Sequence, residues 1–129
     1  MRRDEEGFTL IELMVVVLIV GILAAIGVPK FAASKERAFL ASMKADLRNL
    51  AVAQEAYLYE KGSYFSGAVP DPALNFQPST GVTITLSGVT PSGWQALAQH
   101  SETSHVCSVF AGSAAPLGNA VNEGVPACN

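Results

Sequence analysis

The second half of this sequence contains no positively charged side chain. All eight Lys and Arg residues lie at or before Lys61, and residues 62–129 add only the acidic side chains of Asp71, Glu102 and Glu123. The formal net charge of the chain is -3. Proteins that bind nucleic-acid phosphates present clustered Lys and Arg side chains. The sequence therefore predicts no specific nucleic-acid site.

Short motifs for nucleotide, haem and nucleophile chemistry are also missing. The chain has no P-loop, no CxxCH haem-attachment pattern and no serine-nucleophile motif. His100, His105 and Cys107 lie close in the sequence and would suit a nucleophile with its base, or metal ligands. An ordinary strand explains the shared face of His105 and Cys107 more simply. We expect no enzyme, cofactor or metal site, and a membrane-anchored enzyme is the least favoured alternative.

Cysteine is scarce, and both residues, Cys107 and Cys128, lie in the second half. In an oxidising compartment they would most simply form a disulfide, for which chain entropy gives roughly 3 kcal/mol. A pair of zinc thiolates is the alternative, but the close spacing and further ligands of a zinc site are missing. A disulfide would hold the end of the chain on a predicted strand.

One long apolar run occupies the N-terminal part of the chain. Between Phe8 and Val28 the only clearly polar side chains are Thr9 and Glu12. A helix of about 20 residues, at ~1.5 Å per residue, matches the ~30 Å hydrocarbon layer of a membrane. The run therefore predicts a single transmembrane helix.

A cleaved secretory signal is the other interpretation of this run, with small residues for cleavage in the segment 23–27. The run is long for a signal, however, and a helical pattern continues beyond Pro29. Arg2 and Arg3 favour a cytoplasmic N-terminus. Residues 30–129 are then expected on the far side of the membrane.

An amphipathic helix is predicted over residues 30–61. Its apolar residues recur every three or four positions, which places them on one helical face. Gly62 stands where a C-terminal cap is expected. The residues of this stripe are Phe39, Met43, Leu47, Leu50 and Tyr57.

Three residues inside the long helical pattern disfavour a regular helix. Pro29 removes one backbone hydrogen bond and crowds the preceding turn, and Gly21 and Gly27 each cost about 1 kcal/mol relative to alanine. We expect the helix to bend or melt at these positions.

Beyond a Gly- and Pro-rich loop, three segments have the character of strands. "GVTITLSG" alternates apolar and polar residues, "GWQALAQH" follows a turn, and "HVCSVFAG" comes third. Neighbouring strands joined by short turns form an antiparallel meander, and the stripe on the helix would cover one face of it. The tail "AAPLGNAVNEGVPACN" has no period and little to bury. The predicted fold class is α+β.

Glu12 is the unexpected residue of the apolar run. An ionisable side chain in lipid costs roughly 2.5–3.5 kcal/mol, so it indicates a function unless it merely reaches the membrane surface. Cleavage between Gly7 and Phe8 would create a positively charged amine one helical turn away. That amine would pair with Glu12 of its own chain or of a neighbour. Pairing between chains would let Glu12 set the position of each subunit relative to its neighbour during assembly.

The segment "GFTLIELMVVVLIVGILAAIGVP" closely resembles the N-terminal signature of type IV pilins. The plan of a long helix, a meander and a disulfide-closed C-terminus is similar to that family as well. The resemblance implies four segments: a leader at 1–7, a membrane and fibre-core helix at 8–29, an amphipathic helix at 30–61, and a loop with a sheet at 62–129.

The same resemblance implies roles for particular residues. A prepilin peptidase would cut after Gly7 and methylate the amine of Phe8, and Phe8, Thr9 and Glu12 would act in assembly. The segment 21–29 would lose helical structure in the filament. Cys107 and Cys128 would bracket a variable C-terminal loop.

The implied function is that of a pilus subunit, held in the inner membrane and then polymerised into a surface filament for motility, adhesion or surface attachment. Its expected partners are further copies of itself, the peptidase, an assembly platform and separate ATPases. A pseudopilin of a type II secretion system or a minor pilin is the alternative. The exported half offers few carboxylates for the calcium loop that major pseudopilins carry.

Overall fold

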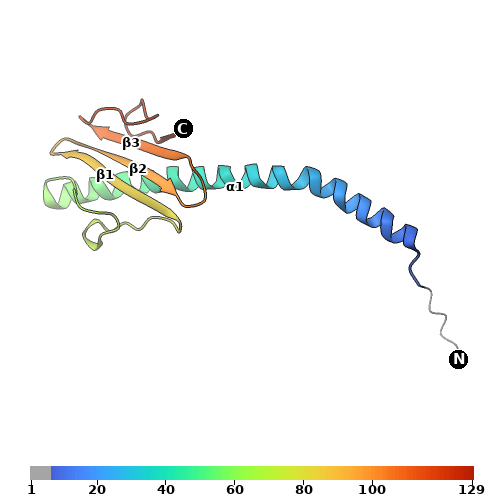
Figure 1. Cartoon of the computed structure of the whole chain (residues 1–129). Helices are drawn as coiled ribbons and strands as arrows, with labels where there is room; N and C mark the ends of the chain where they lie inside the picture. The colour runs from blue at the N-terminus through green and yellow to red at the C-terminus, as the bar shows by residue number, and fades with distance from the viewer. Residues whose placement is uncertain (1–6) are drawn as a thin grey trace. The chain divides into compact units, whose positions relative to one another are not determined.

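The computed structural model describes residues 7–129, which form two compact units divided after Lys35. Except for Gly7, the predicted leader lies outside the described residues. The helix α1 (Leu10–Lys61) belongs to both units. In the second unit it is followed by a short 3-10 turn, η1 (Pro72–Leu74), and by four strands (Figure 1). The division falls later than the boundary predicted at residue 29.

The helix α1 runs without a break through Gly21, Gly27 and Pro29. The sequence predicted that the helix would bend or melt here, and it does not melt in this single chain. A proline removes one hydrogen bond and crowds one turn, and the turns on both sides keep their own bonds. Loss of helical structure at these residues in an assembled filament stays a prediction.

The four strands form one antiparallel sheet in the order β1-β2-β3-β4. The predicted three-stranded meander is confirmed, and β1 extends further than predicted, to Thr90. Only β4 was not predicted, because a two-residue strand has no period. The strands are β1 (Val82–Thr90), β2 (Gly93–His100), β3 (Val106–Gly112) and β4 (Ala127–Cys128).

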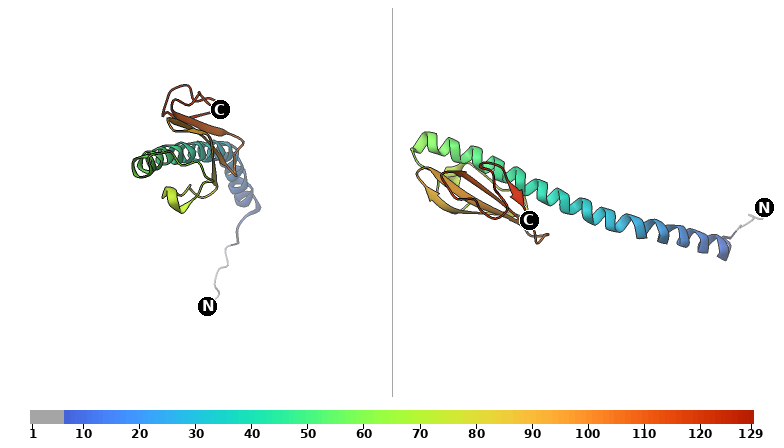
Figure 2. Two further views of the ribbon diagram at one scale, coloured as in Figure 1. Left: turned by 90° about the vertical axis from the view of Figure 1, so that its left-hand side faces the viewer. Right: turned by 90° about the horizontal axis from the view of Figure 1, so that it is seen from above.

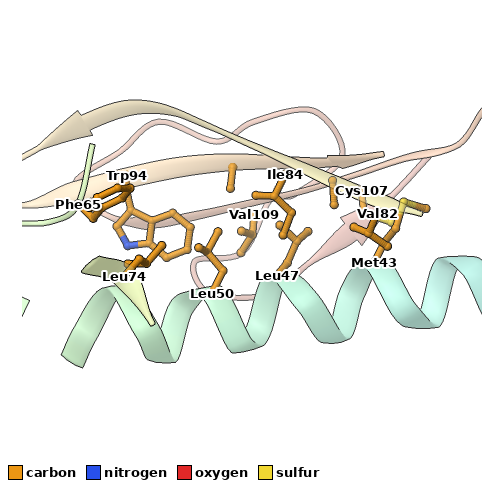
Figure 3. Packing of buried hydrophobic residues seen from close by; sticks show 12 residues of the cluster. Met43, Leu47, Leu50, Phe65, Leu74, Val82, Ile84, Trp94, Cys107 and Val109 are labelled. Carbon is orange, nitrogen blue, oxygen red and sulfur yellow. The ribbon is translucent and has the colours of Figure 1, made fainter. Parts of the chain in front are cut away.

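The core of the second unit lies between α1 and one face of this sheet. The helix lies along the sheet in each view (Figures 1 and 2). Met43, Leu47 and Leu50 are completely buried and point toward the strands (Figure 3). Trp94 of β2 is also completely buried, and its indole nitrogen has no hydrogen-bond partner within the described chain. The predicted stripe is thus confirmed at its centre, while its end residues are partly exposed.

Two polar residues that the sequence did not single out lie on this buried face of α1. Asp46 is 3% exposed, and its carboxylate accepts hydrogen bonds from the main-chain and hydroxyl groups of Ser79, both at 2.8 Å. The Gln54 side chain donates to the carbonyl of Phe65 at 3.0 Å and accepts from its N–H at 2.9 Å. Together they attach both ends of the 62–81 loop to the helix. The buried polar groups of these two side chains are thus satisfied, as stability requires.

The C-terminal tail buries more than its sequence suggested. Ala120 is completely buried, and Ser108 of β3 donates its hydroxyl to the carbonyl of Leu117 at 2.7 Å. Glu123 accepts a hydrogen bond from the N–H of Gly112 at 2.7 Å. These contacts join the tail to β3. The prediction that the tail has little to bury is therefore wrong.

Alkaline pH is expected to weaken the contact between α1 and the loop through Tyr64. Burial raises the pKa of Tyr64, and so does the Glu55 carboxylate that accepts its hydroxyl hydrogen at 3.0 Å. The folded state therefore favours the neutral phenol. Its contribution to stability is complete below the ordinary tyrosine value of about 10 and is lost as pH rises beyond it.

Ultraviolet absorbance of tyrosinate measures this shift, with Tyr64→Phe subtracted to isolate the residue. Glu55→Gln keeps an acceptor and removes the charge, so the Tyr64 pKa should move back toward its ordinary value. An unchanged titration in Glu55→Gln would contradict the assignment of the charge effect to Glu55.

Candidate functional site

Thr9 and Glu12 form a closed hydrogen-bonded pair at the start of α1. The Glu12 carboxylate accepts hydrogen bonds from the N–H and from the hydroxyl of Thr9, both at 2.8 Å. The N–H of Glu12 donates to the Thr9 hydroxyl at 3.3 Å. This reciprocal arrangement is a capping box, in which two groups at a helix start satisfy each other. The helix consequently begins at Leu10, not at Phe8 as predicted.

From the sequence, Glu12 was interpreted as a charge in lipid and as the partner of a new amine, but not as part of a helix cap. The pattern Thr-x-x-Glu before an apolar run is itself a signal for a helix start, so the cap was available in the sequence. The cap gives Glu12 a local partner before any cleavage. Its role in assembly stays a prediction.

The predicted cleavage position lies outside the helix. Gly7 and Phe8 have no regular secondary structure, and the Phe8 side chain is 85% exposed. A side chain at Gly7 would meet no atom within 4 Å. The bond between them is therefore open to solvent in the described chain, as a peptidase substrate requires.

The first unit exposes a continuous apolar surface. The large hydrophobic side chains of its helix range from 48% exposed at Val15 to 72% at Leu10. A stretch of this helix with mean hydropathy 2.9 is long enough to cross a membrane, and none of it is buried within the chain. A helix that is apolar on all sides is stable only in lipid or among other helices.

The second unit closes its C-terminus with the predicted disulfide between Cys107 and Cys128, which is confirmed. Cys107 is completely buried in β3 and pairs with Cys128 across the sheet register. Its sulfur is bonded to that of Cys128, so the group formed by His100, His105 and Cys107 contains no free thiol. Within residues 7–129, no group of three or more potential ligands is placed to hold a metal ion.

A family model described as the prokaryotic N-terminal methylation motif matches residues 2–28. A relative over a longer range is the type IV wide pilus major component PilA4 of Thermus thermophilus. It is 37% identical over 90 residues, which cover 70% of this chain and 68% of that relative. The chain belongs to the type IV pilin family.

Other relatives include both pilins and secretion proteins. The type II secretion system core protein G of Pseudomonas aeruginosa is 40% identical over 83 residues, covering 60% of this chain and 58% of the relative. The type IV major pilin protein PilA of Myxococcus xanthus is 43% identical over 76 residues, covering 59% of this chain and 33% of the relative. The chain thus spans less than two thirds of the length of the first relative and about one third of the second.

Proposed function

We propose that this chain is the structural subunit of a type IV pilus. The observation that carries the proposal is the helix of the first unit, which is apolar on all sides and packs on nothing within its own chain. Such a surface suits two environments, the inner membrane before assembly and a bundle of identical helices afterwards. The second unit, with its own core and disulfide, forms the outer part of the filament.

In this proposal a prepilin peptidase cuts after Gly7 and methylates the amine of Phe8. The methylated amine remains protonatable, so it pairs with the Glu12 carboxylate of a neighbouring subunit during assembly. The subunit is not an enzyme, and an assembly platform with separate ATPases drives polymerisation and retraction. The resulting extracellular filament serves motility, adhesion or surface attachment.

A pseudopilin of a type II secretion system, or a minor pilin, is the second candidate. The identity of 40% to a secretion core protein favours it. The longer alignment to a pilus component, which covers 70% of this chain, supports the pilus subunit instead.

Mass spectrometry of fibres sheared from cells that express the chain tests the proposal. An abundant N-terminal peptide beginning at Phe8 with one added methyl group is the expected result. Gly7→Val is the matched control, because a side chain at this position meets no neighbouring atom and leaves the fold intact. This variant should stay in the membrane with its leader attached.

Two outcomes would overturn the proposal. Sheared material without the chain, while membranes contain the processed form, would favour the pseudopilin or minor subunit. An N-terminus that remains at Met1 in assembled fibres would leave Glu12 without an amine and contradict the assembly mechanism.

A further inference from the structure

Both histidines of the chain lie against the part of α1 that opens the second unit. The His100 ring, at the end of β2, stacks on the Phe39 ring with centroids 4.2 Å apart and an interplanar angle of 24°. The Nε2 atom of His105, just before β3, lies 3.1 Å from the Glu36 Oε1 atom. Glu36 and Phe39 are three residues apart and share one helical face. The turn between β2 and β3 is therefore attached to α1 through two imidazole rings.

His105 meets a hydrogen-bond acceptor at each of its two ring nitrogens. While Nε2 faces the Glu36 carboxylate, Nδ1 lies 2.6 Å from the main-chain oxygen of Asn129. A neutral imidazole has one N–H, so it can donate to only one of these oxygens. The protonated ring has two N–H groups and donates to both. This geometry is therefore complete only when His105 carries a proton on each nitrogen.

Other hydrogen bonds hold the two acceptors in place independently of the ring. Glu36 Oε1 also accepts from the Thr103 hydroxyl at 3.2 Å. The Asn129 side chain accepts from the N–H of Val106 at 2.8 Å, and its own N–H donates to the Val106 carbonyl at 3.2 Å. The ring thus fits between two oxygens that are already positioned on the helix and on the tail.

His100 shows the opposite preference. Its Nδ1 atom accepts a hydrogen bond from the N–H of Glu102 at 3.1 Å, which requires that this nitrogen carry no proton. The His105 ring meets the negative charge of Glu36 on α1 at Nε2 and the Asn129 oxygen of the tail at Nδ1.

We propose that His105 is a proton-operated latch that ties the C-terminal segment to α1. The protonated ring joins Asn129 to Glu36, and loss of one proton releases one of the two contacts. Addition of a proton to the ring closes the latch, and its loss opens it. The inference does not depend on whether the chain forms a pilus.

Nuclear magnetic resonance of the full chain in detergent micelles tests the latch, with 15N placed in the histidine rings. The chain has only two histidines, and His100→Gln assigns their signals. At pH 5.5 both ring nitrogens of His105 should be protonated. Between pH 5.5 and 8, hydrogen exchange of the Asn129 N–H should accelerate about two- to fivefold beyond the intrinsic change, as expected for a partly exposed ion pair.

Glu36→Gln should remove most of this extra acceleration. The Glu36 side chain is 49% exposed, so the variant should fold normally. Glu102→Gln is the matched control, which removes a carboxylate of the same turn that forms no ion pair with His105 among the described residues, and it should behave like the parent chain. A His105 ring that is neutral at pH 5.5 would overturn the proposal. So would an unchanged pH dependence of Asn129 exchange in both Glu36→Gln and His105→Gln.

Discussion

Glu12→Ala is expected to leave the chain inserted in the membrane and to reduce its incorporation into surface fibres at least about tenfold. Removing one partner of a buried charge pair costs roughly 3–5 kcal/mol, because the other charge is left unpaired in an apolar environment. The methylated amine of Phe8 would be that unpaired charge. Immunoblots of sheared fibres and of membranes from cells with the variant as their sole subunit give the two amounts.

The capping box provides two variants that separate a local role of Glu12 from an assembly role. Glu12→Gln keeps a side chain that completes a capping box but removes the negative charge. Thr9→Ala keeps the charge and removes the hydroxyl that binds Glu12. Assembly should fail in Glu12→Gln as it does in Glu12→Ala, whereas Thr9→Ala should lose less, because the charge that pairs with the amine remains.

Normal piliation by Glu12→Gln together with failure of Thr9→Ala would reverse the conclusion. Glu12 would then act as a helix cap, and another group would have to set the register between subunits. Circular dichroism of both variants in micelles checks that the helix itself is retained.

Removal of the disulfide is expected to have the largest effect on stability. Cys107→Ser combined with Cys128→Ser should lower the free energy of unfolding by about 2–5 kcal/mol. The bond closes a loop over a sequence separation of 21 residues and connects β4 to β3, where the register has few other pairs. Polar hydroxyl groups would also replace the completely buried sulfur of Cys107.

Urea unfolding in micelles measures this effect, and the fluorescence of the buried Trp94 is a suitable probe. Adding a reductant to the parent chain should reproduce the lower midpoint, while the double variant should not respond to the reductant. Equal midpoints for the parent and the variant would show that tail packing at Ala120 and Glu123 is sufficient without the bond.

The parts of the fold that the sequence predicted are those with a regular period. Alternation in β1 and the three-to-four spacing from Met43 to Leu50 fixed the sheet, the helix and the face that joins them. The short strand β4 was not predicted, because it depends on the disulfide and the tail, which have no local sequence pattern. The burial of Asp46 and Gln54 was not predicted, because polar residues on a helix are ordinarily solvated. Their hydrogen-bond partners come from a loop that is distant in the sequence.

The residues of the candidate site that could be predicted are those that differ from their immediate neighbours in the sequence. Glu12 stands out from the apolar run, and Gly7 and Phe8 are defined by their position before it. The contacts of His105 were not predictable, because Glu36 and Asn129 lie far from it in the sequence and meet only in the folded unit. The helix continues through Pro29 because the cost of a proline is local and the turns on either side keep their own hydrogen bonds.

The all-round apolar helix of the first unit has a consequence for the direction of assembly. Lipid tails and leucine-rich helices are about equally apolar, so moving such a helix from bilayer to fibre yields little hydrophobic free energy. For a pilus subunit, the hydrophobic free energy of moving this helix from the membrane into the fibre is then close to zero. Small contributions would then decide the direction of this transfer: the proposed charge pair at Glu12, contacts between second units, and the work of an external motor. In a pilus, such a surface would let the same molecule leave the fibre, return to the membrane and be used again.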